Sequence, residues 1–415
     1  AGNIWFGSWW GGLNYLDRNF DNFLHYNETN GLSSSIVSSF VEDDFGNFWI
    51  GTEGGGVNYF DRSKKAFQVF KHDINNTNSL ALNNVQDLEL YLNDRLIIAT
   101  HGRGIDIATI DKGQLYFQHF THDPTDPNSL SSNWVTTLEV DANNRIWIGT
   151  IDGGLNQFLL EEKRFIRYAE NTTTKSRINT IFEDEQSNIW IGSSRGLGLV
   201  KEEHFQIDYE LAEEINRQNS KDILCMYRDS SHNFWIGTGG DGLLFFKDDF
   251  SDFQRYHGKD GLPSNVIQGI LADEQQNLWL STNNGLSKFD PIRKQFENYD
   301  ISDGLQSNEF NVDAFKKSSK GEMLFGGVNG FNIFYPEQAQ KNTYHPPVII
   351  TELRVGDQRT SLLSISGETS PQIELNYRQT PFSFNFVALN YTQPGKNKLA
   401  YQLEGNASSW IEIDI

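Results

Sequence analysis

Charged and amide side chains recur at one kind of place in this sequence, in or beside short glycine turns. Such groups hydrogen-bond sugar hydroxyls, and the guanidinium groups of Arg103 and Arg195 suit bidentate contacts with the carboxylates of acidic sugars. We take them as candidate ligand contacts, although a solvated turn residue is the simpler alternative for each. Together with one aromatic residue, the candidates are Glu53, His101, Arg103, Trp134, Asp152, Arg195, Asp241, Asn283 and Asn329.

Other chemistry is weakly indicated. His101, Arg103 and Asp106 suggest metal binding or proton transfer, but no second histidine stands at ligand spacing, so a structural role or a ligand contact is favoured. The sequence therefore predicts no metal, no cofactor and no catalytic residue. Trp134 and the pair Trp9-Trp10 are predicted to lie in loops or at strand edges, where they can stack on a sugar ring. The lone Cys225 lies on a predicted strand and is expected to be a buried, inert thiol.

The glycine turns belong to a repeat. The pattern is a strand such as Asn47–Thr52, a glycine turn and a second strand, and its tryptophan position recurs at intervals of 43 to 50 residues, at positions 5, 49, 97, 147, 190, 235, 279 and 324. Residues 97 and 324 lack the tryptophan. A period of roughly 40–50 residues is the size of one four-stranded propeller blade.

Each complete unit predicts four strands, here called inner, second, third and outer. The last unit has no outer strand after Tyr335, whereas Phe23–Tyr26 is an outer strand without a unit of its own. A ring closes only if the last blade is completed by the other end of the chain, so we predict an all-β, seven-bladed β-propeller over residues 21–340. Residues 1–20 are then a remnant of a preceding blade. An eight-bladed ring is the alternative, but no inner strand precedes Asn3.

Strand alternation assigns structural roles to the repeated residues. The tryptophans are expected to fill the wedge between neighbouring blades, rather than to form a ring of sugar-stacking side chains. The glycine after each Trp-Ile pair is expected to let neighbouring backbone approach closely. Inner strands carry mostly small or neutral residues, with Asp87 and Asp313 as the exceptions. That composition disfavours a glycosidase or lyase, which needs convergent carboxylates or a Tyr/His pair.

Composition narrows the class of protein further. With 34 Lys+Arg against 55 Asp+Glu, the formal charge is −21, which opposes binding to nucleic acid or to an anionic membrane. No apolar run is long enough to span a bilayer, and no signal peptide opens the chain.

From residue 341 the pattern changes to strands of a sandwich, at 348–355, 373–375 and 382–389. We interpret residues 341–415 as the first part of an immunoglobulin-like domain and both termini as cuts.

Two phrases carry a family resemblance. The run Gly261–Val266, followed by Asn277–Trp279 and Gly285–Asp290, resembles the two-component regulator propeller repeat. The run Asn390–Pro394, with Leu399–Gly405 and Trp410, resembles the Tyr-Tyr-Tyr domain that follows such propellers. The resemblance implies the periplasmic sensor region of a hybrid two-component system, anchored in the inner membrane. This chain would be the second propeller and part of the immunoglobulin-like domain, without the histidine kinase.

The resemblance also implies partners. These are an oligosaccharide ligand derived from a glycan, the preceding propeller of the same protein, and a second copy through the C-terminal domain. Transmission to the kinase is expected at the junction Pro336–Pro347, because a ring of packed blades resists deformation. A propeller enzyme and a protein-interaction scaffold are the alternative functions. A glycan that shifts the melting temperature would separate a sensor from a scaffold.

Overall fold

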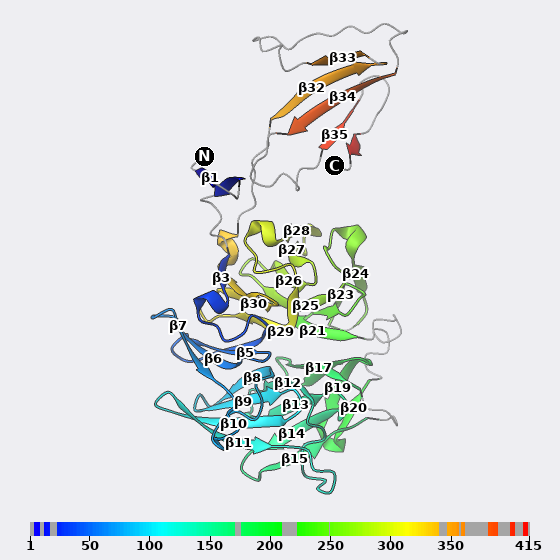
Figure 1. Ribbon diagram of the computed structural model, residues 1–415. Coiled ribbons are helices and arrows are strands. Elements are labelled where there is room, and N and C mark those ends of the chain that lie inside the picture. Colours follow the sequence, from blue (N-terminus) through cyan, green and yellow to red (C-terminus); the bar gives the residue numbers. More distant parts are fainter. Residues whose placement is uncertain are drawn as a thin grey trace. The chain divides into compact units, whose positions relative to one another are not determined.

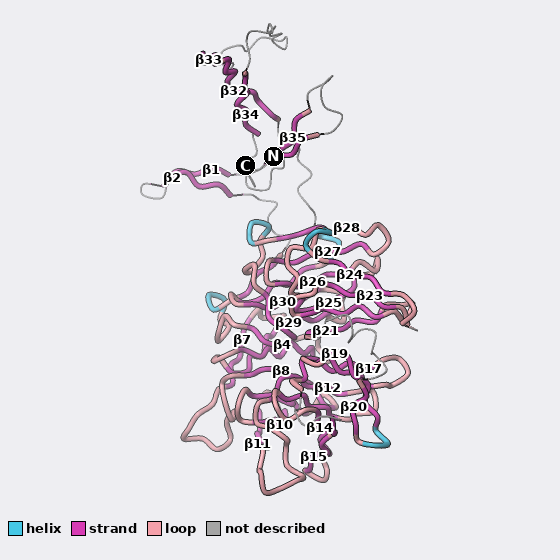
Figure 2. The backbone as a smooth tube through the Cα atoms, turned by 90° about the vertical axis from the view of Figure 1, so that its right-hand side faces the viewer, coloured by secondary structure: helices cyan, strands magenta, loops and turns pink. Residues whose placement is uncertain are grey.

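Seven antiparallel sheets follow one another along residues 23–339 of the computed structural model (Figures 1 and 2). The structure describes residues 4–8, 12–16, 23–170, 176–209, 222–248, 250–339, 347–356, 358–361, 381–388, 399–402 and 410–413. Two compact units divide the chain, one at Phe20–Ala339 and the other made of Ala1–Asn19 with Gln340–Ile415. The first unit is the propeller, and its seven sheets are the blades.

The first three blades contain four strands each in the order inner, second, third and outer, and blade 4 adds a fifth strand to the same four. Blade 1 consists of β4 (Val37–Glu42), β5 (Phe48–Thr52), β6 (Gly56–Asp61) and β7 (Ala66–Phe70). Blade 2 consists of β8 (Val85–Tyr91), β9 (Arg95–Thr100), β10 (Gly104–Asp111) and β11 (Gln114–Phe120). Blade 3 consists of β12 (Val135–Val140), β13 (Ile146–Thr150), β14 (Leu155–Leu159) and β15 (Arg164–Arg167). Blade 4 consists of β17 (Ile178–Glu183), β18 (Ile189–Ser193), β19 (Gly196–Lys201) and β20 (Gln206–Asp208), with β16 (Ala169–Glu170) added in parallel to β20.

Blades 5 and 6 keep this order, and blade 7 is completed from the other end of the chain. Blade 5 consists of β21 (Ile223–Arg228), β22 (Phe234–Thr238), β23 (Leu243–Phe246) and β24 (Phe253–Tyr256). Blade 6 consists of β25 (Ile267–Ala272), β26 (Leu278–Thr282), β27 (Gly285–Asp290) and β28 (Gln295–Tyr299). Blade 7 consists of β29 (Phe310–Lys317), β30 (Met323–Gly327), β31 (Gly330–Phe334) and β3 (Leu24–Tyr26).

The closing strand is the one that the sequence predicts. In blade 7, β3 pairs antiparallel with β31, Leu24 opposite Ile333 and Tyr26 opposite Phe331. Figure 1 shows this dark blue strand beside the yellow strands of the last blade. The predicted fold class, a seven-bladed propeller followed by part of a β-sandwich, is therefore confirmed.

The tryptophans fill the wedges between blades, as expected. Trp147 is fully buried and packs with Ile178 and Ile181 of the next blade, and Trp279 packs in the same way against Phe310 and Phe325. Burial of one such side chain contributes about 2–3 kcal/mol. In blades 2 and 7, Ile97 and Leu324 take the tryptophan's place in the wedge.

The glycines after the Trp-Ile pairs have a different role from the predicted one. A Cβ atom at Gly51 would lie 2.6 Å from Oγ of Ser39 and 2.9 Å from Cγ1 of Val85 in the next blade. The space is therefore filled by side chains of two inner strands, not by approaching backbone. The prediction named the right residue but the wrong neighbour, because the second strand contacts the next blade through side chains.

The second unit is described in part, and all of its described elements are strands. β1 (Ile4–Ser8) pairs with β2 (Gly12–Leu16). β32 (Val348–Val355) pairs with β33 (Gln358–Ser361) and β34 (Phe382–Ala388), and β35 (Leu399–Tyr401) pairs with β36 (Ile411–Ile413). The predicted strand at 373–375, the pair Trp9-Trp10 and most of the junction, 340–346, lie outside the described residues. The assignment of residues 1–20 to a preceding blade stays a prediction.

Candidate functional site

The nine candidate residues lie on one face of the propeller, which we call the rim. The rim has two parts. The turns between second and third strands are residues 53–55, 101–103, 151–154, 194–195, 239–242, 283–284 and 328–329. The described residues among the three that precede each inner strand are 34–36, 82–84, 132–134, 176–177, 222, 264–266 and 307–309. Backbone hydrogen bonds join one blade to the next here. The N–H of Gly56 donates to the carbonyl of Asn83 at 2.9 Å, and that of Gly104 to the carbonyl of Asn133 at 3.0 Å.

His101 and Trp134 are brought together, although 33 positions separate them in sequence. Their backbones form an isolated antiparallel bridge, and their rings meet edge to face with centroids 4.7 Å apart. Gly102, at a φ of 112°, lies under the indole, where a Cβ would be 3.5 Å from the ring. Trp134 nevertheless remains 46% exposed. The result is a tryptophan held in place from below with an accessible ring.

The polar neighbour of this pair is Gln86 on β8. Its Oε1 lies 3.0 Å from Nδ1 of His101. With an amide oxygen as acceptor, Nδ1 carries the proton and Nε2 has the free lone pair. His101 can thus accept a hydrogen bond from a hydroxyl group placed next to Trp134.

Three further candidates are exposed, and one is half-buried. Glu53, Arg103 and Asp152 are exposed at the tips of their turns. Arg195 is half-buried, and its guanidinium carbon lies 4.5 Å from the ring centroid of Tyr209. That stacking fixes the direction of the Arg195 side chain.

The last three candidates are engaged with other residues of the fold. Oδ1 of Asp241 lies 3.9 Å from a guanidinium nitrogen of Arg255. The side chain of Gln268 donates to Oδ1 of Asn283 at 2.6 Å. Nδ2 of Asn329 donates to the carbonyl of Gln306 at 2.9 Å, so this amide holds its own turn. Of the nine candidates, Asn329 is therefore the weakest as a ligand contact.

Sequence reasoning missed Arg177. This exposed residue precedes β17, and its backbone exchanges bonds with Ser194, whose N–H donates to the carbonyl of Arg177 at 3.0 Å. It therefore lies beside the turn that carries Arg195. Its position directly before an inner strand, like that of Trp134, is the feature that could have revealed it.

Small polar residues of the inner strands connect the blades rather than line an open channel. The hydroxyl of Ser38 donates to the carbonyl of Val85 at 2.8 Å, and that of Thr136 to the carbonyl of Ile178. Nδ2 of Asn179 donates to the carbonyl of Ile223 in the same way. Their residue types are thus explained by folding.

The inner strands are also more acidic than predicted. Glu89 on β8 and Glu139 on β12 occupy equivalent positions on adjacent blades, two residues after Asp87 and Thr137, and Lys316 is their equivalent on β29. Burial, and then repulsion from Glu89, raises the pKa of Asp87 to about 7. Burial also raises the pKa of Glu139 well above its usual value. The expectation of a neutral channel, with Asp87 and Asp313 as the only exceptions, is therefore wrong.

The carboxylate of Asp87 is held by the protein itself. Asp87 accepts the N–H of Leu88 at 2.8 Å and that of Leu138, on the next blade, at 2.7 Å. Among the described residues no group of three histidine, cysteine, aspartate or glutamate side chains is arranged to hold a metal ion. Asp87 thus joins blades 2 and 3.

Asp106 does not form a site with His101. It is fully buried, and its carboxylate receives the N–H of Ala81 at 2.7 Å and lies 2.7 Å from Nδ1 of His119. That hydrogen bond raises the pKa of His119.

Cys225 is buried and free, as predicted, and burial raises the pKa of its thiol well above the usual value.

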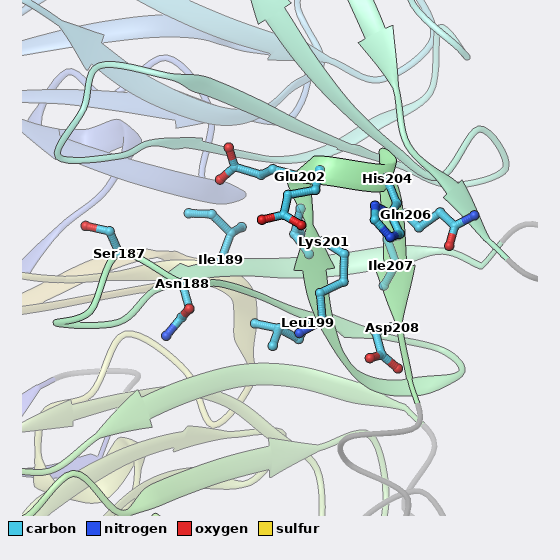
Figure 3. Close-up of a pocket in the computed structure, with 12 residues that line it drawn as sticks. Ser187, Asn188, Ile189, Leu199, Lys201, Glu202, His204, Gln206, Ile207 and Asp208 are labelled. Atoms are coloured by element: carbon cyan, nitrogen blue, oxygen red, sulfur yellow. The ribbon is translucent and has the colours of Figure 1, made fainter.

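A cavity of about 600 Å³ lies elsewhere, among the strands of blade 4 (Figure 3). It is lined by β19, β20 and the turn at 187–188, on the side of the blade opposite to the turn with Arg195. Its charged lining has both signs, and Glu202 is ion-paired with Arg145 of blade 3. We therefore place the candidate site at the rim.

The repeat itself is found in known proteins. The sequence pattern of the two component regulator propeller family matches residues 31–54, 129–152, 174–195, 218–240 and 261–284. These segments run from the rim through the inner and second strands of blades 1, 3, 4, 5 and 6. The two blades without a match are those that lack the tryptophan. Five of the seven blades thus contain the two-component regulator propeller repeat.

Two further proteins are similar to the chain over longer stretches. A histidine kinase from Formosa agariphila is 28% identical over 281 residues, an alignment that covers 62% of this chain and 20% of the relative. The extracellular domain of a hybrid two-component system from B. thetaiotaomicron aligns with a TM-score of 0.76 and 26% identity, over 99% of this chain and 55% of that one. The chain thus spans about a fifth of the kinase.

A third similar protein is an enzyme. Virginiamycin B lyase from Staphylococcus aureus aligns with a TM-score of 0.55 over 75% of this chain and 97% of the enzyme, at 13% identity. At that identity the likeness extends to the propeller fold alone.

No helix in the described part of the chain is both long and apolar enough to cross a membrane.

Proposed function

We propose that this chain is the ligand-sensing region of a hybrid two-component system and detects oligosaccharides released from a glycan. The propeller repeats, the similar histidine kinase and the similar extracellular domain support the sensor role. The region works in the periplasm as part of a protein anchored in the inner membrane. It transmits to a cytoplasmic histidine kinase that lies outside this chain.

The observation that carries the oligosaccharide assignment is the exposed ring of Trp134 on its support of His101 and Gly102. A sugar ring presents an apolar face of C–H groups and a border of hydroxyls. Trp134 provides a flat apolar surface for the first, and His101 with Gln86 provides hydrogen-bonding groups for the second. Because the indole is already braced, little side-chain entropy is lost on binding.

The test uses the chain of residues 1–415 and a panel of oligosaccharides of four to eight units, with binding measured by calorimetry and by the shift of the melting temperature. We expect one class to bind saturably and to raise the melting temperature. Trp134→Ala should weaken this binding by about tenfold or more, because one aromatic stacking contact contributes about 1–1.5 kcal/mol beyond its area. The matched control is Trp410→Ala, which removes an exposed tryptophan of the other unit. Equal affinities of both variants and the parent would contradict the rim as the site.

Two alternatives are separated by the same preparation. A protein-interaction scaffold would show no shift of the melting temperature with any glycan. A propeller lyase or glycosidase would release new products from a polysaccharide, and Asp87→Asn or Asp313→Asn would abolish that release. We expect no turnover, because the carboxylate of Asp87 is buried and occupied by two backbone N–H groups.

The sensor needs partners that this chain does not contain. We propose that the preceding propeller of the same protein and a second copy, held through the C-terminal domain, complete the receptor. A ligand drives the kinase only if it binds two arrangements of these parts with different affinity.

A further inference from the structure

The charged residues of the rim are not spread evenly around the ring. Three arginines belong to the described rim, and all of them lie on blades 2 to 4: Arg103, Arg177 and Arg195. Four of its five carboxylates lie on blades 5, 7 and 1: Asp222, Asp241, Glu309 and Glu53. The fifth, Asp152, lies between the arginines. The rim thus has a basic half and an acidic half, in a chain whose formal charge is −21.

The basic half contains the exposed tryptophan. Gly102, beside Arg103, donates its N–H to the carbonyl of Asn133, and Ile151 donates to the carbonyl of Trp134 at 2.9 Å. On the other side, Ser194 donates to the carbonyl of Arg177, and Arg195 follows it. Trp134 therefore lies between the turn of Arg103 and the turn of Asp152, in the half that carries the three guanidinium groups.

From this arrangement we infer that the ligand is an anionic oligosaccharide, one that carries carboxylate or sulfate groups. A guanidinium group forms two parallel hydrogen bonds with a carboxylate or a sulfate group. A neutral sugar has no anionic group that could accept such a pair. The attraction acts over about 8 Å at physiological ionic strength, so the acidic remainder of the surface does not cancel it. The inference rests on the proposed oligosaccharide-sensing function and adds the charge class of the ligand.

Two side chains are placed to make these contacts. Arg195 is stacked over Tyr209, and this stacking fixes the orientation of its guanidinium group. Arg177 is exposed and lies beside the turn that carries Arg195, because its carbonyl accepts the N–H of Ser194. Arg177 is exposed, so glutamine is tolerated there, whereas Arg195→Gln also gives up the stacking on the buried ring of Tyr209.

The test compares matched probes that differ in charge alone. Oligogalacturonides are measured against their methyl esters, and sulfated carrageenan oligosaccharides against their desulfated forms, by calorimetry in 20 and 200 mM salt. We expect one of the two charged probes to bind at least about tenfold more tightly than its neutral partner and to lose affinity as salt rises. Which of the two binds distinguishes a uronate from a sulfate ligand.

Variants locate the contact. Arg177→Gln and Arg195→Gln should each weaken binding of the charged probe by about tenfold and leave the melting temperature of the free protein within a degree or two. The control is Arg293→Gln, an exposed arginine between the third and outer strands of blade 6. Tighter binding of neutral oligosaccharides, or charged-probe affinity unchanged in both rim variants, would overturn the inference while the sensor proposal stands. Binding of no oligosaccharide would overturn both.

Discussion

Asp106 occupies the position at which three other blades have asparagine. Aspartate in place of asparagine changes the charge but keeps the hydrogen bond that the side-chain oxygen accepts. In each case a side-chain oxygen on the third strand accepts a backbone N–H from the loop that leads to the inner strand, and the asparagines are Asn58, Asn156 and Asn332. In blade 2 the acceptor is a buried carboxylate, and His119 lies beside it. The histidine is thus the partner that makes a buried charge tolerable at this position.

This pairing predicts a graded response to substitution at residue 106. Asp106→Asn should be mild, because the amide oxygen still accepts the N–H of Ala81, whereas Asp106→Ala leaves that N–H unpaired and should cost about 1–3 kcal/mol. The raised pKa of His119 means that the ion pair stabilises the fold fully below about pH 6.5 and is lost as the pH rises through the folded-state pKa. The difference in melting temperature between wild type and Asp106→Asn should therefore shrink from pH 6 to pH 9. A difference independent of pH would contradict the ion pair.

The raised pKa of Glu139 predicts how the stability of the propeller changes with pH. Its pKa is raised by burial and then by repulsion from Glu89, and attraction from Lys316 opposes this only in part. A carboxyl group with a raised folded-state pKa stabilises the fold at low pH, and this contribution is lost as the pH rises above about 4.5. Glu139→Gln should therefore melt higher than wild type at pH 8.5 and by a smaller margin at pH 5. The control Glu161→Gln changes an exposed glutamate and should show no such trend.

At the scale of the blade, the glycine after each Trp-Ile pair sets how closely two inner strands approach. A Cβ at Gly149 would lie 2.7 Å from Cγ2 of Thr137 and 2.8 Å from Cγ2 of Ile178 in the next blade. Gly149→Ala should thus destabilise the propeller by about 1–3 kcal/mol through overpacking. Adding Thr137→Ser removes one clashing methyl group and should restore part of the loss in urea unfolding. Gly258→Ala, with no atom within 4 Å of the added Cβ, is the neutral control.

The blades were predictable because every one of them solves the same packing problem. A large apolar side chain recurs every 43 to 50 residues and fills each wedge, and it is a tryptophan in five of the seven blades. The strand count then places every second turn on one face, so the nine candidates reach the rim. Partners across blades were not predictable. Whether Leu138 donates to Asp87, or His101 meets Trp134, depends on distances between blades that no local pattern encodes.

A bulge explains the acidic inner strands that the sequence did not predict. In the inner strands of blades 1 to 6 the pairing register shifts after the first residue, for example between Val85 and Asp87. The extra residue reverses the alternation of side chains beyond it. Simple alternation therefore does not reveal that Glu89 and Glu139 occupy equivalent places next to each other.

At the scale of the molecule, the ring depends on one short strand from the N-terminal end. Phe23, directly before β3, is buried and packs edge to face against Tyr299 of blade 6 and Phe334 of blade 7. Tyr26 stacks on Phe331. The strand thus joins blade 7 to the apolar clusters on both of its sides, and without it β31 becomes an open sheet edge.

Two truncations isolate this contribution. Removing residues 1–20 keeps β3 and should leave the melting temperature of the propeller unchanged. Removing residues 1–30 also takes away Phe23, whose burial contributes about 2–3 kcal/mol, the half-buried Tyr26, and the ladder to β31. Because 1 kcal/mol corresponds to roughly 2 °C in a unit of this size, we expect a drop of roughly 10 °C or more. A peptide of residues 21–31 should recover part of it by pairing with the open edge, and equal melting of the two truncations would show that the ring is closed by other contacts.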